Sequence, residues 1–223
     1  MTTATITAPA QRKQELLGET VVVIGDSAGI GLETARRARA EGADAILTAF
    51  DATDTDRLEQ FFDELPGPID HVIVVAAESD YEPLAEMSFA RARRFFDEHL
   101  MLPLHIARSA AGKIRPGGTL LFLGGTGARR PVAGVALGSA VTVGMRAIVA
   151  SLAVELAPVR VNLIAAGFVD TPLSASLRNT LPTGRVVGPD DLAATAVHLA
   201  AHSALTGATY DIDRGRQLLP RRV

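Results

Sequence analysis

The chain of 223 residues contains no cysteine and no tryptophan, and aromatic residues make up only 4% of it. The absence of cysteine excludes disulfides, thiolate catalysis and cysteine-ligated zinc. The formal net charge is −3 and no basic cluster occurs, so nucleic acid is not an expected partner. Histidines 71, 105, 198 and 202 show no spacing typical of metal ligands, so we expect no metal site.

The first 14 residues are rich in Thr and Ala and lack the apolar core of a signal peptide. We expect a flexible tail at 1–14 and one domain over 15–223. No later run approaches the length of a membrane span. The sequence therefore predicts a cytoplasmic protein with no membrane partner.

Short apolar runs alternate with helical patterns along the rest of the chain. Such alternation indicates βαβ units, a parallel sheet and right-handed crossovers. The predicted fold is α/β, a single-domain, Rossmann-like, doubly wound parallel sheet. Strands are predicted at 20–24, 45–50, 71–76, 119–124, 160–165 and 209–212, and helices at 29–41, 54–64, 88–113, 138–157 and 190–202. Turn signals stand at 66–68, 116–118, 188–190 and 206–207.

Residues 21–31 (VVVIGDSAGIG) join an apolar strand to a helix through three glycines, Gly25, Gly29 and Gly31. A helix that begins in this way offers backbone N–H groups and the positive end of its dipole to a pyrophosphate. Glycines also serve tight turns that bind nothing. Their place between strand and helix favours nucleotide binding.

Together with this loop, three later segments resemble motifs of the short-chain dehydrogenase/reductase family. The resemblance covers about residues 18–219. The three segments are residues 152–162 (LAVELAPVRVN), 167–172 (GFVDTP) and 206–213 (TGATYDID). The resemblance implies a Rossmann-like fold and an NAD(P)H cofactor that supplies hydride to a small-molecule substrate. The cofactor-binding positions are Gly25, Ser27, Gly29, Ile30, Gly31, Asp51, Ala76, Thr142, Val169 and Thr171.

The chain departs from this family where the family usually does its chemistry, with Asn, Ser, Tyr and Lys. The aligned positions hold His99, Gly125, Gly138 and Thr142. Only two tyrosines occur, Tyr81 and Tyr210, and neither has a lysine four residues later. Alcohol oxidation by the usual mechanism of the family is therefore not expected.

The stretch between Gly31 and Thr53 is too short for a strand, a helix and another strand. We expect a fold shortened between its second and third strands by about one helix. Asp51 lies 20 residues after Gly31, where an acid can bind a ribose 2′-OH. The resemblance instead places Asp51 at the adenine. The choice between NADH and NADPH stays open.

Two residues are candidates for catalysis. An imidazole at His99 can donate a proton near neutral pH, although a lone histidine is equally often a plain helix-face residue. Thr126 could supply a hydroxyl, although its side chain can point to the other face of its strand. Candidate substrate contacts are Tyr81, Arg130 and Phe168.

Glycine in place of tyrosine enlarges the predicted pocket, which then suits a bulky, fairly apolar substrate. Hydride transfer to an activated acceptor, an iminium ion or a conjugated carbonyl, needs little help from an acid. An atypical reductase is therefore the leading hypothesis. A non-redox enzyme on the same scaffold and an inactive nucleotide-binding relative are the alternatives. By resemblance, the helical segments 88–113 and 138–157 would pair in a homodimer or homotetramer.

Overall fold

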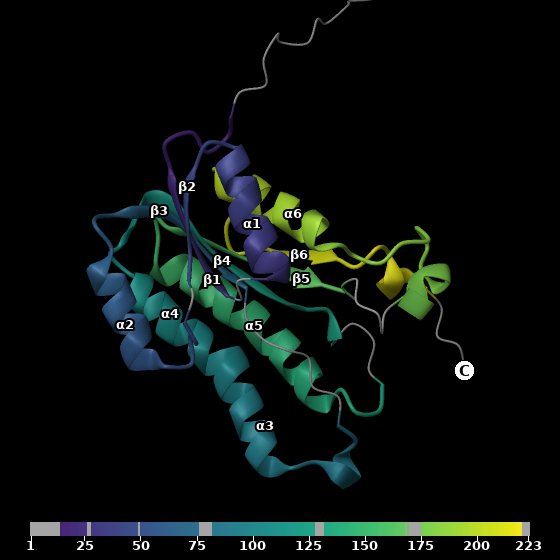
Figure 1. Ribbon diagram of the computed structural model, residues 1–223. Coiled ribbons are helices and arrows are strands. Elements are labelled where there is room, and N and C mark those ends of the chain that lie inside the picture. The colour runs from purple at the N-terminus through teal and green to yellow at the C-terminus, as the bar shows by residue number, and fades with distance from the viewer. Residues whose placement is uncertain are drawn as a thin grey trace, which may run out of the picture.

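The computed structural model describes residues 14–25, 28–48, 50–75, 82–127, 132–167, 169 and 175–219, with the side chains of 175–177 excepted. Six strands form one parallel sheet in the order β2-β1-β3-β4-β5-β6 (Figure 1). The doubly wound α/β prediction is therefore confirmed. The strands are β1 (Thr20–Gly25), β2 (Asp44–Leu47), β3 (Ile69–Val75), β4 (Ile114–Gly125), β5 (Arg160–Ala166) and β6 (Thr209–Ile212).

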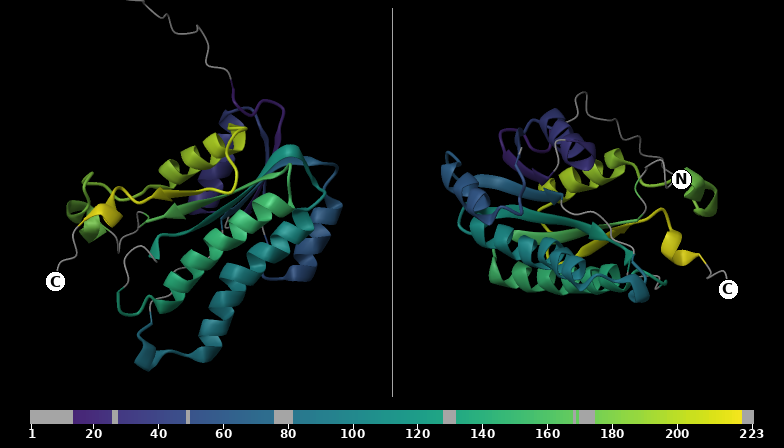
Figure 2. Two further views of the ribbon diagram at one scale, coloured as in Figure 1. Left: turned by 180° about the vertical axis from the view of Figure 1, so that it is seen from behind. Right: turned by 60° about the horizontal axis from the view of Figure 1, so that its bottom comes forward.

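Helices cover both faces of the sheet (Figures 1 and 2). On one face, α1 and α6 pack over side chains such as Val21, Val23 and Ile164. On the other face, α2, α4 and α5 pack over side chains such as Val22 and Phe122. The helices are α1 (Gly29–Ala40), α2 (Thr55–Glu64), α3 (Phe89–Phe96), α4 (Leu102–Ala110), α5 (Ala136–Glu155) and α6 (Pro189–Ala201).

The apolar run of β1 explains its central place. Val21, Val22, Val23 and Ile24 are all fully buried, so the strand is covered on both faces. A continuous run of β-branched residues is typical of such strands in parallel sheets. The chain leaves β1 through α1 for β2, and then crosses the other face through α2 to β3.

The half of the sheet that contains β2 and β1 is short. The usual doubly wound order, 3-2-1-4-5-6, has three strands in that half, whereas this sheet has two. The stretch between Gly31 and Thr53 holds the rest of α1 and the four residues of β2. Consequently β2 forms an edge of the sheet.

The predicted helix 88–113 is wrong in one respect, because it is not continuous. A π-helical turn, η2 (Asp97–Met101), lies between α3 and α4, and Leu102 N–H bonds to the Asp97 carbonyl. Pro103 has no N–H for the carbonyl four residues earlier, and its ring would collide with that carbonyl in an α-helix. A wider turn avoids the collision, which accounts for the π-turn.

The predicted turn at 116–118 is also wrong, because these residues lie within β4. The pairing of β3 with β4 shifts register between Ile69 and His71, which accommodates the Pro-Gly-Gly sequence. At Gly118 a Cβ would stand 2.2 Å from the Asp70 carbonyl oxygen, so glycine lets the two strands approach.

Arg160, at the start of β5, ties α6 to the sheet. Its buried guanidinium donates to the carbonyls of Leu199, Ala200 and His202 at the end of α6 and to that of Gly117. A cation at a helix C-terminus meets carbonyls that have no partner within the helix. Arg160 therefore fixes the helix that covers one face of β4 and β5.

The expectation that no run reaches the length of a membrane span needs correction. Among the described helices, α5 is long and apolar enough to cross a membrane by length and composition. The same composition serves its observed packing, in which one face of α5 lies on β4 and β5.

Candidate functional site

The carboxyl ends of β1 and β3 form the switch point of the sheet, because their connections leave toward opposite sides. Ligands of open α/β sheets bind at such a point. The α1 helix starts there, with Ala28 as its N-cap, no capping side chain and no acid in its first turn. Gly29 has φ +55° and open space where a Cβ would stand. This helix end fits an anionic group.

The other predicted loop residues have separate surroundings. Gly25 is required by packing, since a Cβ there would lie 2.3 Å from the Val75 carbonyl oxygen. Gly31 is buried and Ile30 half-buried within the first turn of α1. Ser27 lies outside the described residues. Gly25 is therefore required for the packing of the sheet, whereas Gly29 leaves the N-terminus of α1 accessible to a ligand.

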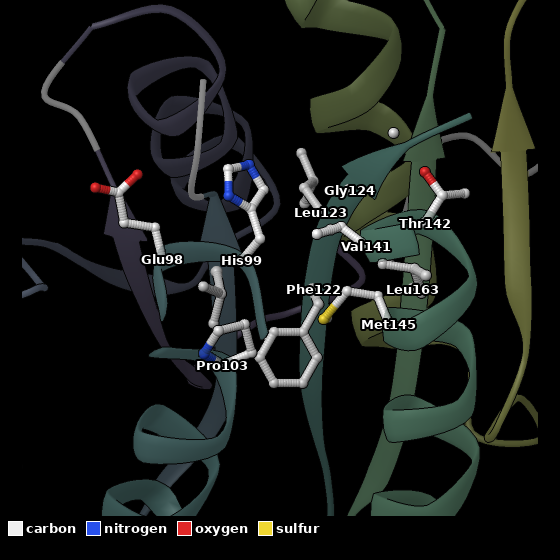
Figure 3. A pocket seen from close by; sticks show the side chains of 12 residues that line it. Glu98, His99, Pro103, Phe122, Leu123, Gly124, Val141, Thr142, Met145 and Leu163 are labelled. Carbon is white, nitrogen blue, oxygen red and sulfur yellow. The ribbon is translucent and has the colours of Figure 1, made fainter. Parts of the chain in front are cut away.

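A mostly apolar cavity of about 40 Å³ opens between β4, α5 and the η2–α4 segment. Figure 3 shows His99 and Pro103 on one side, Val141, Thr142 and Met145 on the other, and Phe122 and Leu123 between them. Val74, Glu98, Gly124, Gly125 and Leu163 complete the lining. The cavity therefore brings together three positions that sequence comparison singled out, His99, Gly125 and Thr142.

The imidazole of His99 is firmly placed. Its Nδ1 lies 2.8 Å from the carbonyl oxygen of Phe95, and its ring stacks on the Phe95 ring with centroids 3.9 Å apart and planes 29° apart. The side chain is half-buried at the cavity wall.

Around the cavity, the glycines leave room. A Cβ at Gly138 would meet nothing within 4 Å, and one at Gly125 would come no closer than 4.0 Å to its neighbours. The buried Thr142 hydroxyl donates to the Gly138 carbonyl (2.8 Å), so its proton is used within α5. Oxygen lone pairs of Thr142 remain its means of contact with a ligand.

Other predicted residues lie elsewhere. Thr126 follows β4, is not among the residues that line the cavity, and bonds through its N–H to the Ala166 carbonyl. Asp51 is exposed, and its carboxylate accepts from the N–H and hydroxyl of Thr53 (2.9 and 2.8 Å). These hydrogen bonds lower the pKa of Asp51 and hold the carboxylate in a local turn before α2.

Five further predictions fall on residues that the structure does not describe, namely Ala76, Tyr81, Arg130, Phe168 and Thr171. Val169 forms an isolated parallel bridge with Val187. Within the described ranges, no group of three or more His, Asp or Glu residues could hold a metal ion.

Sequence reasoning missed two features of the site. Pro103 lines the cavity and lies next to the π-turn that carries His99, and a proline inside a predicted helix was the available signal. A second, more open groove of about 380 Å³ lies between the start of α2 and the η2 turn. Glu98 lines both spaces, and no spacing in the sequence indicated this.

The fold and the site define a class, the doubly wound dinucleotide-binding proteins. Comparison with known proteins narrows it. The family profile described as "Enoyl-(Acyl carrier protein) reductase" matches residues 49–217. The cis-4-hydroxycyclohexanecarboxylate dehydrogenase of Sinomonas cyclohexanicum is 32% identical over 216 residues, covering 87% of this chain and 85% of that protein. The short-chain dehydrogenase/reductase malC of Malbranchea aurantiaca is 24% identical over 262 residues, covering 95% and 99%.

A solved small-chain dehydrogenase in complex with NADPH superposes with a TM-score of 0.84 at 26% identity, covering 90% of this chain and 99% of that one. The chain belongs to the short-chain dehydrogenase/reductase family.

Proposed function

We propose that this protein is an atypical NAD(P)-dependent reductase that acts on a bulky, activated small molecule, either an iminium ion or a conjugated carbonyl. The observation that carries the proposal is the cavity at the carboxyl edge of the sheet, with His99, Gly125 and Thr142 around it. The uncapped start of α1 lies at the same edge, because β1 and β4 are parallel. A cofactor seated on α1 would extend toward the cavity.

The choice of an activated acceptor follows from the side chains. The positions that the family gives to Ser and Tyr are Gly125 and Gly138, and neither can donate a proton. An iminium ion that accepts hydride at its carbon becomes a neutral amine without any proton transfer. Positioning alone can supply much of the rate in such a reaction.

The size of the cavity limits what it holds. About 40 Å³ accommodates a reacting group and not a whole bulky molecule. We therefore place the body of the substrate outside the cavity, where Tyr81, Arg130 and Phe168 remain proposed contacts. The walls at Val141, Met145 and Phe122 favour an apolar reacting end.

Cofactor binding is assigned to the start of α1, where the N–H groups at Gly29, Ile30 and Gly31 would meet the pyrophosphate. When bound, NAD(P)H supplies hydride. Thr142 and Val169 are proposed contacts of its nicotinamide half and Asp51 of its adenosine half. The open Gly29 position supports this fit, because a side chain there would occupy the space in front of the helix end.

Calorimetric titration of the whole chain with NADPH and with NADH tests the proposal first. Micromolar binding of either supports it and fixes the cofactor. A Gly29→Asp variant, which adds a side chain and a negative charge at the helix end, should lose at least tenfold in affinity. Gly112→Ala is the matched control, since Gly112 also has a positive φ (+78°) and open space but follows α4 at the opposite edge. No binding of either nucleotide would contradict the proposal and favour a non-redox activity.

A second copy of the chain is the proposed partner, in a homodimer or homotetramer of a cytoplasmic enzyme. The outer face of α5 supports this, because it exposes Ala140, Val143, Ala147, Ala150 and Val154 at helical spacing. Sedimentation of wild type and of Val143→Glu measures it. The wild type should be a dimer or larger and the variant a monomer; a monomeric wild type would contradict this part.

A further inference from the structure

His99 has a defined protonation pattern. A backbone carbonyl can only accept a hydrogen bond, so the 2.8 Å contact between Nδ1 and the Phe95 oxygen requires the proton on Nδ1. In the neutral imidazole the other nitrogen, Nε2, is then the acceptor. Proton gain and loss by this ring therefore take place at Nε2.

Phe95 holds the ring in this state from two sides. Its carbonyl accepts a hydrogen bond from Nδ1–H, and its own ring, buried with 6% exposure, stacks on the imidazole. The stacked contact fixes the ring plane, and the carbonyl fixes the rotation within that plane. Few orientations of the His99 ring satisfy both contacts, and in each of them Nε2 points away from the Phe95 carbonyl.

Pro103 supports the same geometry from the following turn. It prevents a regular α-helix across residues 99–103, and the π-turn places His99 on the cavity wall beside Pro103 itself. We infer that Phe95 and Pro103 are positioning residues that hold His99 with its proton on Nδ1, so that Nε2 is the atom through which the site exchanges protons.

This inference rests on the proposed function for its chemical consequence. When a carbonyl is reduced, hydride adds to its carbon and the Nε2–H of an imidazolium gives its proton to the oxygen. The imidazole is left neutral and regains a proton from solvent. An iminium substrate needs no such proton, so only carbonyl reduction should depend on His99.

Among the described residues, the charged side chains nearest to His99 along the chain lie on its own turn and the turn before it. Asp97 and Glu98 precede it directly, and Arg94 is one turn earlier. The described lining residues from β3, β4 and α5 are Val74, Phe122, Leu123, Gly124, Gly125, Val141, Thr142 and Met145, none of them titratable. None of these side chains can therefore replace His99 as an acid.

Long-range ¹H–¹⁵N correlation spectra of the whole chain with labelled histidine test the inference without any substrate. The signal is assigned by its loss in His99→Asn. We expect neutral His99 to carry its proton on Nδ1 in the wild type and to populate both tautomers in Phe95→Leu and Pro103→Ala. Pro189→Ala, at the first turn of α6, is the matched control and should match the wild type.

The outcomes separate the two claims. A wild-type signal with the proton on Nε2, or variants with an unchanged tautomer, overturns the inference. Should Pro103→Ala not fold, Phe95→Leu and the wild-type spectrum still decide. Nδ1 protonation in a chain that binds neither nucleotide overturns the proposed function and leaves the assignment of His99 intact. Among active preparations, His99→Asn should lower carbonyl turnover about a hundredfold.

Discussion

The backbone N–H of Gly25 donates to the hydroxyl of Thr48 (3.3 Å), which joins the end of β1 to the residue that follows β2. Thr48 is 3% exposed, and its own N–H bonds to the Val23 carbonyl. Val75, at the end of β3, packs closely against Gly25 as well, so the ends of β1, β2 and β3 meet at this glycine. The first glycine of the loop is therefore structural, whereas Gly29 opens onto free space.

Alanine at these two glycines should separate stability from binding. We expect Gly25→Ala to lower the free energy of unfolding by about 3 kcal/mol, because the methyl group collides with the Val75 carbonyl. Gly29→Ala should cost about 1 kcal/mol for its positive φ and weaken nucleotide binding at least tenfold. Urea unfolding and NADPH calorimetry measure the two quantities. Equal effects of both variants on binding would contradict this division.

Arg160 should be far more important to stability than an exposed arginine. Arg160→Met leaves buried carbonyls of Leu199 and Ala200 without their donor and should cost about 3 kcal/mol or more. Arg115→Met removes an exposed ion pair with Asp70 and should cost less than about 1 kcal/mol. Thermal and urea unfolding compare the two variants. A similar loss in both would mean that the α6 anchor is dispensable.

Acid should destabilise the fold through His71. Burial lowers the pKa of His71 below its usual 6.5, although its contact with Glu19 (2.7 Å) partly opposes this, and Arg160 lowers it further. Between the folded and unfolded pKa values the unfolded chain binds more protons. Stability is thus fully present above about pH 6.5 and is lost as the pH falls toward the folded pKa.

Unfolding curves between pH 8 and pH 4.5 for wild type, His71→Leu and the exposed-site control His198→Asn test this. The slope below about pH 6.5 should flatten in His71→Leu alone. A slope that persists in His71→Leu would assign the effect to other groups.

Arg214 occupies a left-handed conformation, with φ +56°, and pairs with Asp191 at the start of α6. Arg214→Ala loses the ion pair and keeps the backbone strain, whereas Arg214→Gly loses the pair and relieves the strain. We expect the glycine variant to be more stable than the alanine variant by about 1 kcal/mol. Urea midpoints of both variants decide; a less stable glycine variant would mean that the strain is negligible here.

Restoring the usual side chains should create ordinary carbonyl reduction. The space at Gly125 and Gly138 admits new side chains, and Gly125 lines the cavity. A combined His99→Asn, Gly125→Ser, Gly138→Tyr and Thr142→Lys variant should reduce simple ketones with NAD(P)H, and the wild type should not. The same variant without Gly138→Tyr is the control. An inactive but folded and nucleotide-binding variant would show that residues beyond these four have also diverged.

The course of the chain could be predicted because its signals are local. β5 and β6 lie within a residue of their predicted positions, since apolar runs bounded by turn residues mark both ends. The predictions at Pro103 and at the Pro-Gly-Gly sequence in β4 were wrong. These residues usually end a helix or a strand, but here a π-turn and a β-bulge accommodate them.

The site was predictable only in part. Spacing within motifs predicted that His99, Gly125 and Thr142 belong to one site, and in the structure all three line the same cavity. Cavity size and the position of Thr126 outside the cavity depend on packing between distant segments, which periodicity does not report. The orientation of Asp51, the residue proposed to contact the adenosine half of the cofactor, is set locally by Thr53.

The edge strand β2 has consequences for how molecules of this protein meet. The backbone N–H and C=O groups of its alternate residues point away from β1. One of these outward carbonyls, that of Ala45, already accepts a hydrogen bond from the Arg39 guanidinium (3.2 Å). The strand is four residues long and begins with an exposed aspartate, so few outward groups could template another chain. The shortened half of the sheet thus carries its own protection against edge-to-edge aggregation, and Arg39 contributes to it by occupying an outward carbonyl.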